Sequence, residues 1–387
     1  MSEIIKHNSG FDFFENVAQL IEQGRQFIGR TADLTMCATY FEVGRMIIEE
    51  EQGGKARAEY GAKLLPELAG FLSVRFERGF SETTLKYARK FYQVYQPSIR
   101  QAMLDESGKR EETQQFQSFL TIFENSVSKR KRQALLAESY PFTLSWSHYL
   151  ILMRIKNEDE RRFYEIEATT QQWSYRVLQR QYGSSLYERL ALSRDKEGVM
   201  RLAKEGHTVE KPDDLLKNPF VLEFSGLDES SSYSETKLEK SLLSKLEKFL
   251  LELGKGFLYE ARQKTFTFEE DHFRLDLVFY NRLLACYVLF DLKIGKLKHQ
   301  DLGQMQMCVN YFDRFIKTEK ENPTIGILLC KEKSDSIVEL TLPENANIYA
   351  SAYSLYLPDK ALLQRKLAEW VEEFEEVHGE VDEKDEA

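Results

Sequence analysis

Two aspartates and a lysine stand in apolar stretches of the C-terminal half of the chain. Asp276 lies in HFRLDLVFY, and Asp291 lies in CYVLFDLKI, two residues before Lys293. A carboxylate in an apolar strand is costly to bury unless it is paired or binds a metal ion. Side chains alternate between the faces of a strand, so Asp291 and Lys293 are expected on the same side.

The two stretches are predicted to form an antiparallel hairpin. If it centres at Leu283–Leu284, Asp276 stands opposite Asp291; a turn at the more turn-like Asn281 and Arg282 would require a bulge or a looser loop. Two carboxylates at one end of a hairpin form a hard oxygen site, which suits Mg²⁺ or Mn²⁺.

The chemistry of such a site is metal-assisted hydrolysis of a phosphodiester. The ion would neutralise a phosphodiester oxygen and lower the pKa of a bound water. Lys293 beside it would orient that water and stabilise developing negative charge. The residues alone leave a structural alternative open, in which an Asp–Lys pair simply closes one end of a sheet.

The elements that must position these residues alternate between helix and strand. The 3.6-residue and two-residue periods of apolar side chains predict a sheet flanked by helices, an α/β domain over residues 233–370. The predicted helices cover 234–254, 299–319 and 361–376, and the predicted strands cover 257–268, 272–280, 284–294, 324–331 and 347–357.

The first half, residues 10–190, is predicted to be all helix. Within it, AEYGAKLLPELAGFLSVRF, the turn GFS and ETTLKYARKFYQVY have the outline of a helix-turn-helix, with Ser81 as an N-cap. Such a motif would place four residues on or near its second helix for contact with DNA, namely Thr83, Lys86, Arg89 and Lys90. An ordinary helical hairpin gives the same spacing.

Charge and composition divide the rest of the chain. Residues 191–232, rich in charges, proline and serine, are predicted to connect the two halves. Residues 371–387 carry nine acids and one base, an acidic tail of net charge −8 within a total of −10. Residues 51–200 carry 24 Lys and Arg against 19 Asp and Glu, a net of +5. A local basic excess steers a polyanion better than the total charge does.

The remaining sequence signals favour a cytoplasmic protein. The four cysteines are scattered and form no C-x-x-C pair, so neither a disulfide framework nor a zinc site is indicated. The first residues show no signal peptide, and no apolar run is long enough to cross a membrane.

The spacing of the three candidate residues resembles a known superfamily. Asp276, fourteen residues, and then Asp291-Leu292-Lys293, with helices before and after, look like a PD-(D/E)xK nuclease. Longer stretches resemble the YhcG-like two-domain bacterial family in both halves: FLLELGKGF, RLDLVFYNRLLACYVLFDLKIGKL, GQMQM and NPTIGILLC, and, towards the N-terminus, YFEVGRMI, GFSETTLKYARKFY and LSWSHYLILMRI. The resemblance covers roughly residues 12–370. It implies a restriction-endonuclease-like mixed sheet joined to a helical domain that binds DNA.

The resemblance assigns roles to matching positions. Asp276 and Asp291 would bind the metal, and Lys293 would be the catalytic lysine. The helical acid of the superfamily would be Glu239, which borders an apolar helix face and would be a third catalytic acid and metal ligand. Glu235 is the alternative, although Ser232-x-x-Glu235 also fits a capping box.

A glutamine in the next helix belongs to the same pattern. Gln304 matches it, but Cys308 stands where members with a recombination-nuclease-like site have a tyrosine. Lys296 and Lys298, beyond the strand end, are candidates for phosphate contact or for a solvated turn.

The prediction from the sequence is therefore a Mg²⁺- or Mn²⁺-dependent DNA endonuclease targeted by its helical half. The alternative is a DNA-binding or adaptor protein that uses the nuclease fold as a non-catalytic scaffold. DNA is the expected partner and a membrane is not. A homodimer and association with restriction or repair proteins are both left open.

Overall fold

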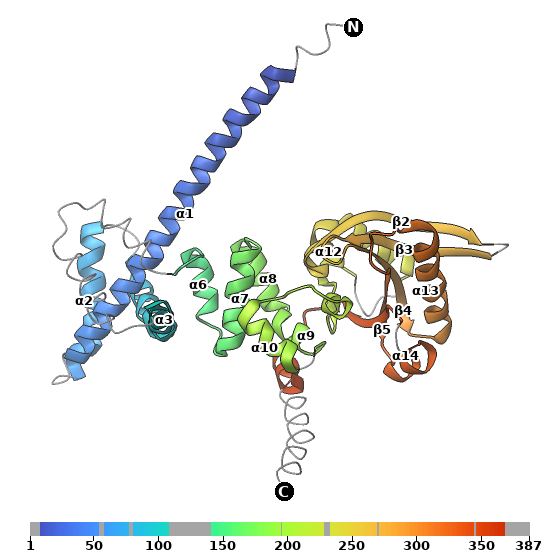
Figure 1. Cartoon of the computed structure of the whole chain (residues 1–387). Helices are drawn as coiled ribbons and strands as arrows, with labels where there is room; N and C mark the ends of the chain where they lie inside the picture. The colour runs from blue at the N-terminus through green and yellow to red at the C-terminus, as the bar shows by residue number, and fades with distance from the viewer. Residues whose placement is uncertain are drawn as a thin grey trace. The chain divides into compact units, whose positions relative to one another are not determined.

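The computed structural model describes residues 8–53, 58–76, 80–107, 141–194, 196–227, 233–268, 271–343 and 346–367. The chain forms two compact units. The helical unit comprises Met1–Arg161 and Ala168–Tyr175, and the sheet unit comprises Arg162–Glu167 and Arg176–Ala387. Figure 1 shows the elements of both. The predicted acidic tail, 371–387, lies outside the described residues.

The described elements between residues 8 and 205 are all helices, which confirms the prediction for the first half of the chain. They are α1 (Asn8–Gly53), α2 (Ala58–Phe76), α3 (Glu82–Ser107), α6 (Trp146–Leu152), α7 (Glu158–Thr170), α8 (Tyr175–Gly183), α9 (Leu186–Ala191) and α10 (Lys196–Glu205).

Aromatic side chains form the core of the helical unit. The ring of Phe91 on α3 lies 4.9 Å from that of Phe142 and 5.0 Å from that of Tyr149. Gly44 allows α1 to approach α3 closely, because a Cβ there would lie 2.1 Å from the carbonyl oxygen of Ala88.

The sheet unit contains a mixed six-stranded sheet in the order β1-β6-β5-β4-β3-β2. The strands are β1 (Phe220–Val221), β2 (Phe257–Phe268), β3 (Asp271–Asn281), β4 (Cys286–Lys296), β5 (Ile325–Glu332) and β6 (Ile348–Ser354). Strands β2, β3 and β4 are antiparallel neighbours, whereas β4, β5, β6 and β1 run parallel. This is the helix-flanked mixed sheet predicted from the sequence.

Helices cover both faces of the sheet (Figure 1). On one face, α11 (Glu235–Ser244) and α12 (Leu246–Leu253) pack Leu242 and Phe249 against strand residues such as Phe290. On the other, α13 (His299–Tyr311) and the π-helical turn η3 (Phe312–Ile316) pack Met305 and Phe312 against residues such as Leu289. α14 (Asp335–Thr341) follows β5. The single helix predicted over 234–254 is in fact two, because the backbone leaves helical geometry at Lys245.

The stretch predicted to connect the two halves, residues 191–232, contains regular structure. It includes α10, the 3-10 turns η1 (Pro212–Leu215) and η2 (Glu223–Ser225), and strand β1, which pairs with β6. Several of its charges are buried and paired. Residues 228–232 lie outside the described residues.

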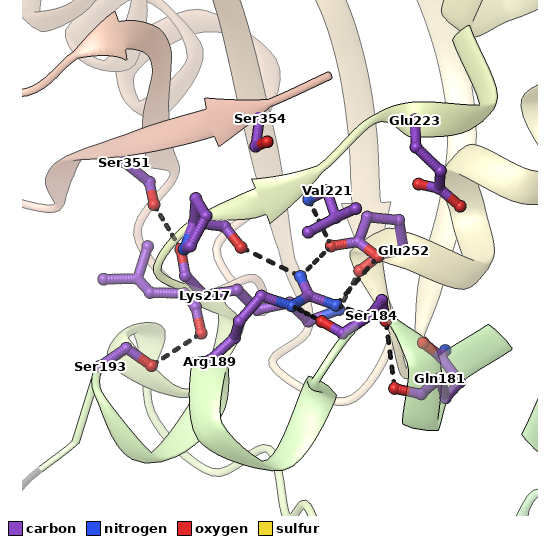
Figure 2. Close-up of polar contacts among 12 residues, drawn as sticks. Gln181, Ser184, Arg189, Ser193, Lys217, Val221, Glu223, Glu252, Ser351 and Ser354 are labelled. Carbon is purple, nitrogen blue, oxygen red and sulfur yellow. Dashed lines mark hydrogen bonds and ion pairs between the residues drawn. The ribbon is translucent and has the colours of Figure 1, made fainter. Parts of the chain in front are cut away.

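The carboxylate of Glu252 is the centre of that buried pairing (Figure 2). It accepts hydrogen bonds from Arg189 Nη1 at 2.5 Å and from the backbone N–H of Val221 at 2.9 Å. Arg180 lies 3.2 Å from its other oxygen, and the ammonium of Lys217 donates to its backbone carbonyl. This network joins β1 and the segment before it to α12.

In the described part of the chain, no helix is both long and apolar enough to cross a membrane.

Candidate active site

The β3–β4 hairpin brings Asp276 and Asp291 together. Its pairs run from Asn281↔Cys286 to Leu277↔Phe290, so the hairpin centres between Leu283 and Leu284. This is the register in which Asp276 stands opposite Asp291, and the charge of Asp291 acts on the Asp276 carboxylate. The turn needs no bulge, because Asn281 closes it by accepting hydrogen bonds from the next N–H groups through its side-chain oxygen.

The two strands separate where the acids lie. Backbone pairing of β3 with β4 ends at Leu277↔Phe290, one residue before Asp276. Asp276 Oδ2 instead accepts a hydrogen bond from the backbone N–H of Leu292, at 2.8 Å. The separation therefore lets a carboxylate enter the space between two otherwise apolar strands.

Burial and like charge make this pair costly to ionise. Burial first, and then the charge of Asp291, raise the pKa of Asp276 to about 7, although the Leu292 N–H opposes the shift. Burial also raises the pKa of Asp291, and Lys293 partly offsets it. Two neighbouring carboxylates that resist full ionisation are a place where a cation would lower the electrostatic energy.

Lys293 is the cation that the chain itself supplies. Its Nζ lies 2.9 Å from Asp291 Oδ2 and 3.8 Å from Asp301 Oδ1. Burial lowers the pKa of Lys293, but Asp291 more than compensates and the net shift is upward. Lys293 therefore remains an ammonium donor beside the carboxylates. Asp301 was not identified from the sequence, where it reads only as a first-turn acid of a helix.

The charge of Glu235 acts on the residues of this site. Glu235 is the first residue of α11, and the N-cap is Ser234, whose hydroxyl accepts the Lys237 N–H at 3.2 Å. The alternative capping role of Glu235 with Ser232 is thus not how this helix begins. The negative charge of Glu235 raises the pKa of both Asp291 and Lys293.

Glu239 is buried one turn further along α11, with 1% of its surface exposed. Its Oε2 accepts a hydrogen bond from Gln263 Nε2 on β2 at 2.7 Å. Its Oε1 has no hydrogen-bond partner among the described residues. Nothing in the sequence around Gln263 distinguishes it from other polar strand residues.

The helix after β4 reaches the same region. Gln304 Nε2 donates to the backbone carbonyl of Arg274, two residues before Asp276, at 3.1 Å. Cys308 is fully buried on the face of α13 that packs on the sheet. Burial, and then the charge of Asp291, raise the pKa of its thiol to about 12, so Cys308 is a packing residue beside the acids.

The predicted nucleic-acid contacts are mostly at the surface. Lys296 and Lys298 are exposed at the end of β4 and just before α13. In the helical unit, Thr83 and Lys90 are exposed on α3, but the two other candidates are already paired. Lys86 forms an ion pair with Glu82 at 2.6 Å, and Arg89 forms one with Glu51 at 2.7 Å.

The donor set fits a hard divalent cation. Among the described residues, no group of three His, Cys, Asp or Glu side chains is arranged to hold a metal ion. Asp276 and Asp291 are the two carboxylates that the hairpin register places opposite each other. Mg²⁺ is commonly bound in this way, by one or two carboxylates together with waters and substrate phosphates.

A polar cavity of about 550 Å³ lies among other residues of the sheet unit, including Arg194, Asp214 and Lys333. Two of its basic groups are already paired with acids. Arg194 lies 3.2 Å from Asp214, and Lys333 lies 2.6 Å from Asp335. We therefore place the candidate chemistry at the carboxylate pair.

Comparison with known proteins places both halves of the chain. Residues 16–189 match the model of the DUF1016 N-terminal domain, and residues 213–368 match that of the YhcG PDDEXK nuclease domain. A protein of Escherichia coli (strain K12) with the name "Putative nuclease YhcG" is 38% identical over 355 residues, covering 91% of this chain and 92% of that protein. A crystal structure of a repair endonuclease from Pyrococcus abyssi is similar over 33% of this chain and 50% of its own, with 17% identity and a TM-score of 0.23.

Proposed function

The chain belongs to the YhcG family of PD-(D/E)xK nucleases, and from that premise we propose that it hydrolyses phosphodiester bonds of DNA with Mg²⁺ or Mn²⁺. The observation that carries the proposal is that Asp276 and Asp291 stand opposite each other across the hairpin, with Lys293 Nζ 2.9 Å from Asp291. A purely structural Asp–Lys pair would not require the second, half-buried acid.

Each residue of the site has a distinct task in this proposal. Asp276 and Asp291 would hold a divalent ion, which would supply Lewis acidity when bound. Lys293 donates hydrogen bonds to the attacking water and to the phosphate oxygens as negative charge develops on them. Glu239 and Gln304 support the site from α11 and α13.

Substrate binding involves surfaces beyond the carboxylates. We propose that the helical domain, residues 10–190, contacts DNA through Thr83, Lys86, Arg89 and Lys90 on α3, and that Lys296 and Lys298 contact phosphates near the scissile bond. The internal ion pairs of Lys86 and Arg89 would then be exchanged for phosphate contacts. Affinity should fall steeply with salt, because phosphate contacts release counterions. A cytoplasmic location agrees with this role.

A non-catalytic DNA-binding or adaptor protein is the second candidate. It is favoured by one observation, the buried thiol of Cys308 at the position where related sites have a tyrosine. In that case the carboxylate pair would be a remnant of the fold.

The deciding experiment uses the full chain. Wild type and Asp291→Ala are incubated with plasmid, linear and branched DNA, and with RNA, in the presence of Mg²⁺ or Mn²⁺. The nuclease proposal requires cleavage of at least one DNA substrate by wild type, inhibition by EDTA, and loss of cleavage in Asp291→Ala. Duplex binding without cleavage under every condition would support the adaptor instead.

A further inference from the structure

A hydrogen bond joins the helix α11 to the edge strand β2 close to the acidic pair. Gln263 Nε2 donates to Glu239 Oε2 at 2.7 Å, and Glu239 is 1% exposed. A buried carboxylate needs compensating partners. In the described part of the chain, Gln263 is the one hydrogen-bond partner that this side chain has.

Gln263 has an unusual backbone conformation. Its φ is +48°, in the left-handed region that non-glycine residues rarely adopt in a strand. Strain of this kind persists only where surrounding contacts enforce it, and it is frequent at functional sites. The hydrogen bond to Glu239 is such a contact.

The strained residue lies opposite Asp276. The flanking pairs of β2 and β3 are Arg262↔Leu277 and Lys264↔Leu275, so the register places Gln263 across from Asp276. Between Ala261 and Phe268, the gap between these two pairs is the one position at which β2 and β3 have no pair; a separate bulge lies at Glu260.

At Asp276, the alternation of β3 side chains between the two faces of the sheet is interrupted. In a regular strand Leu275 and Leu277 would share a face. Instead, Leu277 packs in the cluster beneath α11 and α12, and Leu275 packs in the cluster beneath α13. The change of face occurs at Asp276, the residue that turns towards the Leu292 N–H.

We propose that Glu239 and Gln263 are positioning residues for the acidic pair. Glu239 holds Gln263 in its left-handed conformation, this conformation fixes the irregularity shared by β2 and β3, and the irregularity directs Asp276 towards Asp291. The inference rests on the proposed function for its catalytic meaning. The competing role for Glu239 is that of a direct metal ligand, which its unpartnered Oε1 would allow.

The two roles predict opposite behaviour for a pair of substitutions in the full-length protein. Glu239→Gln keeps an oxygen that can accept from Gln263, but it removes the charge that a metal ligand requires. Gln263→Ala leaves the Glu239 carboxylate in place, but it removes the donor. For positioning, Glu239→Gln should bind Mn²⁺ within about threefold of wild type, whereas Gln263→Ala and Glu239→Ala should each lose about tenfold or more. The double alanine variant should lose no more than either single variant, because both act through one hydrogen bond.

Hydrogen exchange of the β4 peptide that contains Leu292 provides a readout without metal. If the Glu239–Gln263 hydrogen bond positions Asp276, this peptide should exchange faster in Gln263→Ala and Glu239→Ala. It should exchange at the wild-type rate in Glu239→Gln. Gln263→Gly, which adopts positive φ without strain, should also exchange faster. It replaces Gln263→Ala in the comparison if the alanine variant unfolds. Gln306→Ala, which removes a glutamine bonded to Asn310 on α13, is the matched control.

The positioning role is overturned if Glu239→Gln loses Mn²⁺ as severely as Asp291→Asn, or if Gln263→Ala matches wild type in both readouts. The proposed function fails separately, if wild type and Asp291→Asn do not differ in Mn²⁺ binding. In that case, hydrogen exchange at Leu292 still decides whether the Glu239–Gln263 hydrogen bond positions Asp276.

Discussion

Asp276 and Asp291 stand opposite each other one residue beyond the last backbone pair of β3 with β4. The position matters because a carboxylate pair inside a continuous ladder of backbone pairs would have no room for water or a phosphate. At Asp276 and Asp291 that ladder has ended. The two neighbouring carboxylates suit a bound cation, but their repulsion destabilises the folded protein when no cation is bound.

Asp276→Asn should stabilise the metal-free protein. The pKa of Asp276 is about 7 in the folded protein, above its ordinary value of 3.8. Between these values the folded state binds more protons than the unfolded state, so the free energy of unfolding falls as pH rises from about 4 to 7. The asparagine variant should lack this slope and gain about 1–3 kcal/mol at pH 8.

Urea unfolding at pH 5 and pH 8, with and without Mn²⁺, measures this effect. Mn²⁺ should stabilise wild type and not the variant, because a ligand stabilises only the state that binds it. A variant that is less stable than wild type at pH 8 without metal would contradict the electrostatic account of the pair.

A buried histidine should make the sheet unit sensitive to acid. His207 hydrogen-bonds the backbone carbonyl of Asp214 at 2.8 Å, and burial together with Arg194 lowers its pKa to about 3. The unfolded chain therefore binds more protons between about pH 6.5 and 3, and stability is lost as pH falls through that window. His207→Gln, which keeps a donor for the carbonyl, should flatten this loss. The exposed His272→Gln is the control, and an equal flattening in both variants would contradict the prediction.

The Glu252 network predicts a large difference between buried and exposed ion pairs. Glu252→Gln leaves Arg189 buried with a weakened partner and should cost about 3–5 kcal/mol of unfolding free energy. Glu205→Gln removes an exposed partner of Arg201 and should leave the free energy of unfolding nearly unchanged. Chemical denaturation of both variants tests the contrast, and similar costs would mean that the buried network adds little to the attachment of β1.

Local sequence patterns predict much of this fold. The elements that they miss depend on contacts between residues that are distant in sequence. The strand-like patterns in HFRLDLVFY and CYVLFDLKI are enough to predict β3 and β4. Their register followed only from placing the turn at Leu283–Leu284, which the structure shows. Strand β1 has only two residues, Phe220 and Val221, within a charged stretch. Its place in the sheet depends on Glu252 and Arg189, which are distant in sequence, and local composition carries no information about that pairing.

Some residues of the candidate site can be identified from the sequence, and others cannot. Asp276, Asp291 and Lys293 are visible in the sequence because charged residues are anomalous in apolar strands. Gln263 is an ordinary polar residue of an edge strand, and its importance arises from a backbone angle and a contact with Glu239. The charge of Glu235 acts on Lys293 because α11 begins at Glu235. The serine-rich stretch before it offers more than one N-cap, so the sequence does not fix where the helix begins.

Introducing tyrosine at position 308 should damage packing. Cys308 lies on the face of α13 that packs on the sheet and is 0% exposed, so a phenol ring must displace neighbours. We expect a loss of about 1–3 kcal/mol in unfolding free energy. Thermal unfolding beside Cys308→Ala separates overpacking from loss of the thiol; a stable and much more active tyrosine variant would show that the site of this chain is impaired.

Lys293→Ala separates an enzyme from a scaffold most directly. Lys293 contacts Asp291 and lies 17% exposed, so its removal changes the electrostatics of the site without changing the DNA-contacting surfaces proposed on α3. Removing one donor to developing negative charge should lower the cleavage rate by about 10²–10³-fold. Affinity for uncleaved duplex in Ca²⁺ should stay within about threefold of wild type, because most affinity comes from other phosphate contacts. Lys333→Ala, at the end of the neighbouring strand β5, is the matched control and should cleave like wild type. If Lys293→Ala cleaves at the wild-type rate, Lys293 is a structural partner of Asp291; if it loses cleavage and binding together, its role is to hold the substrate.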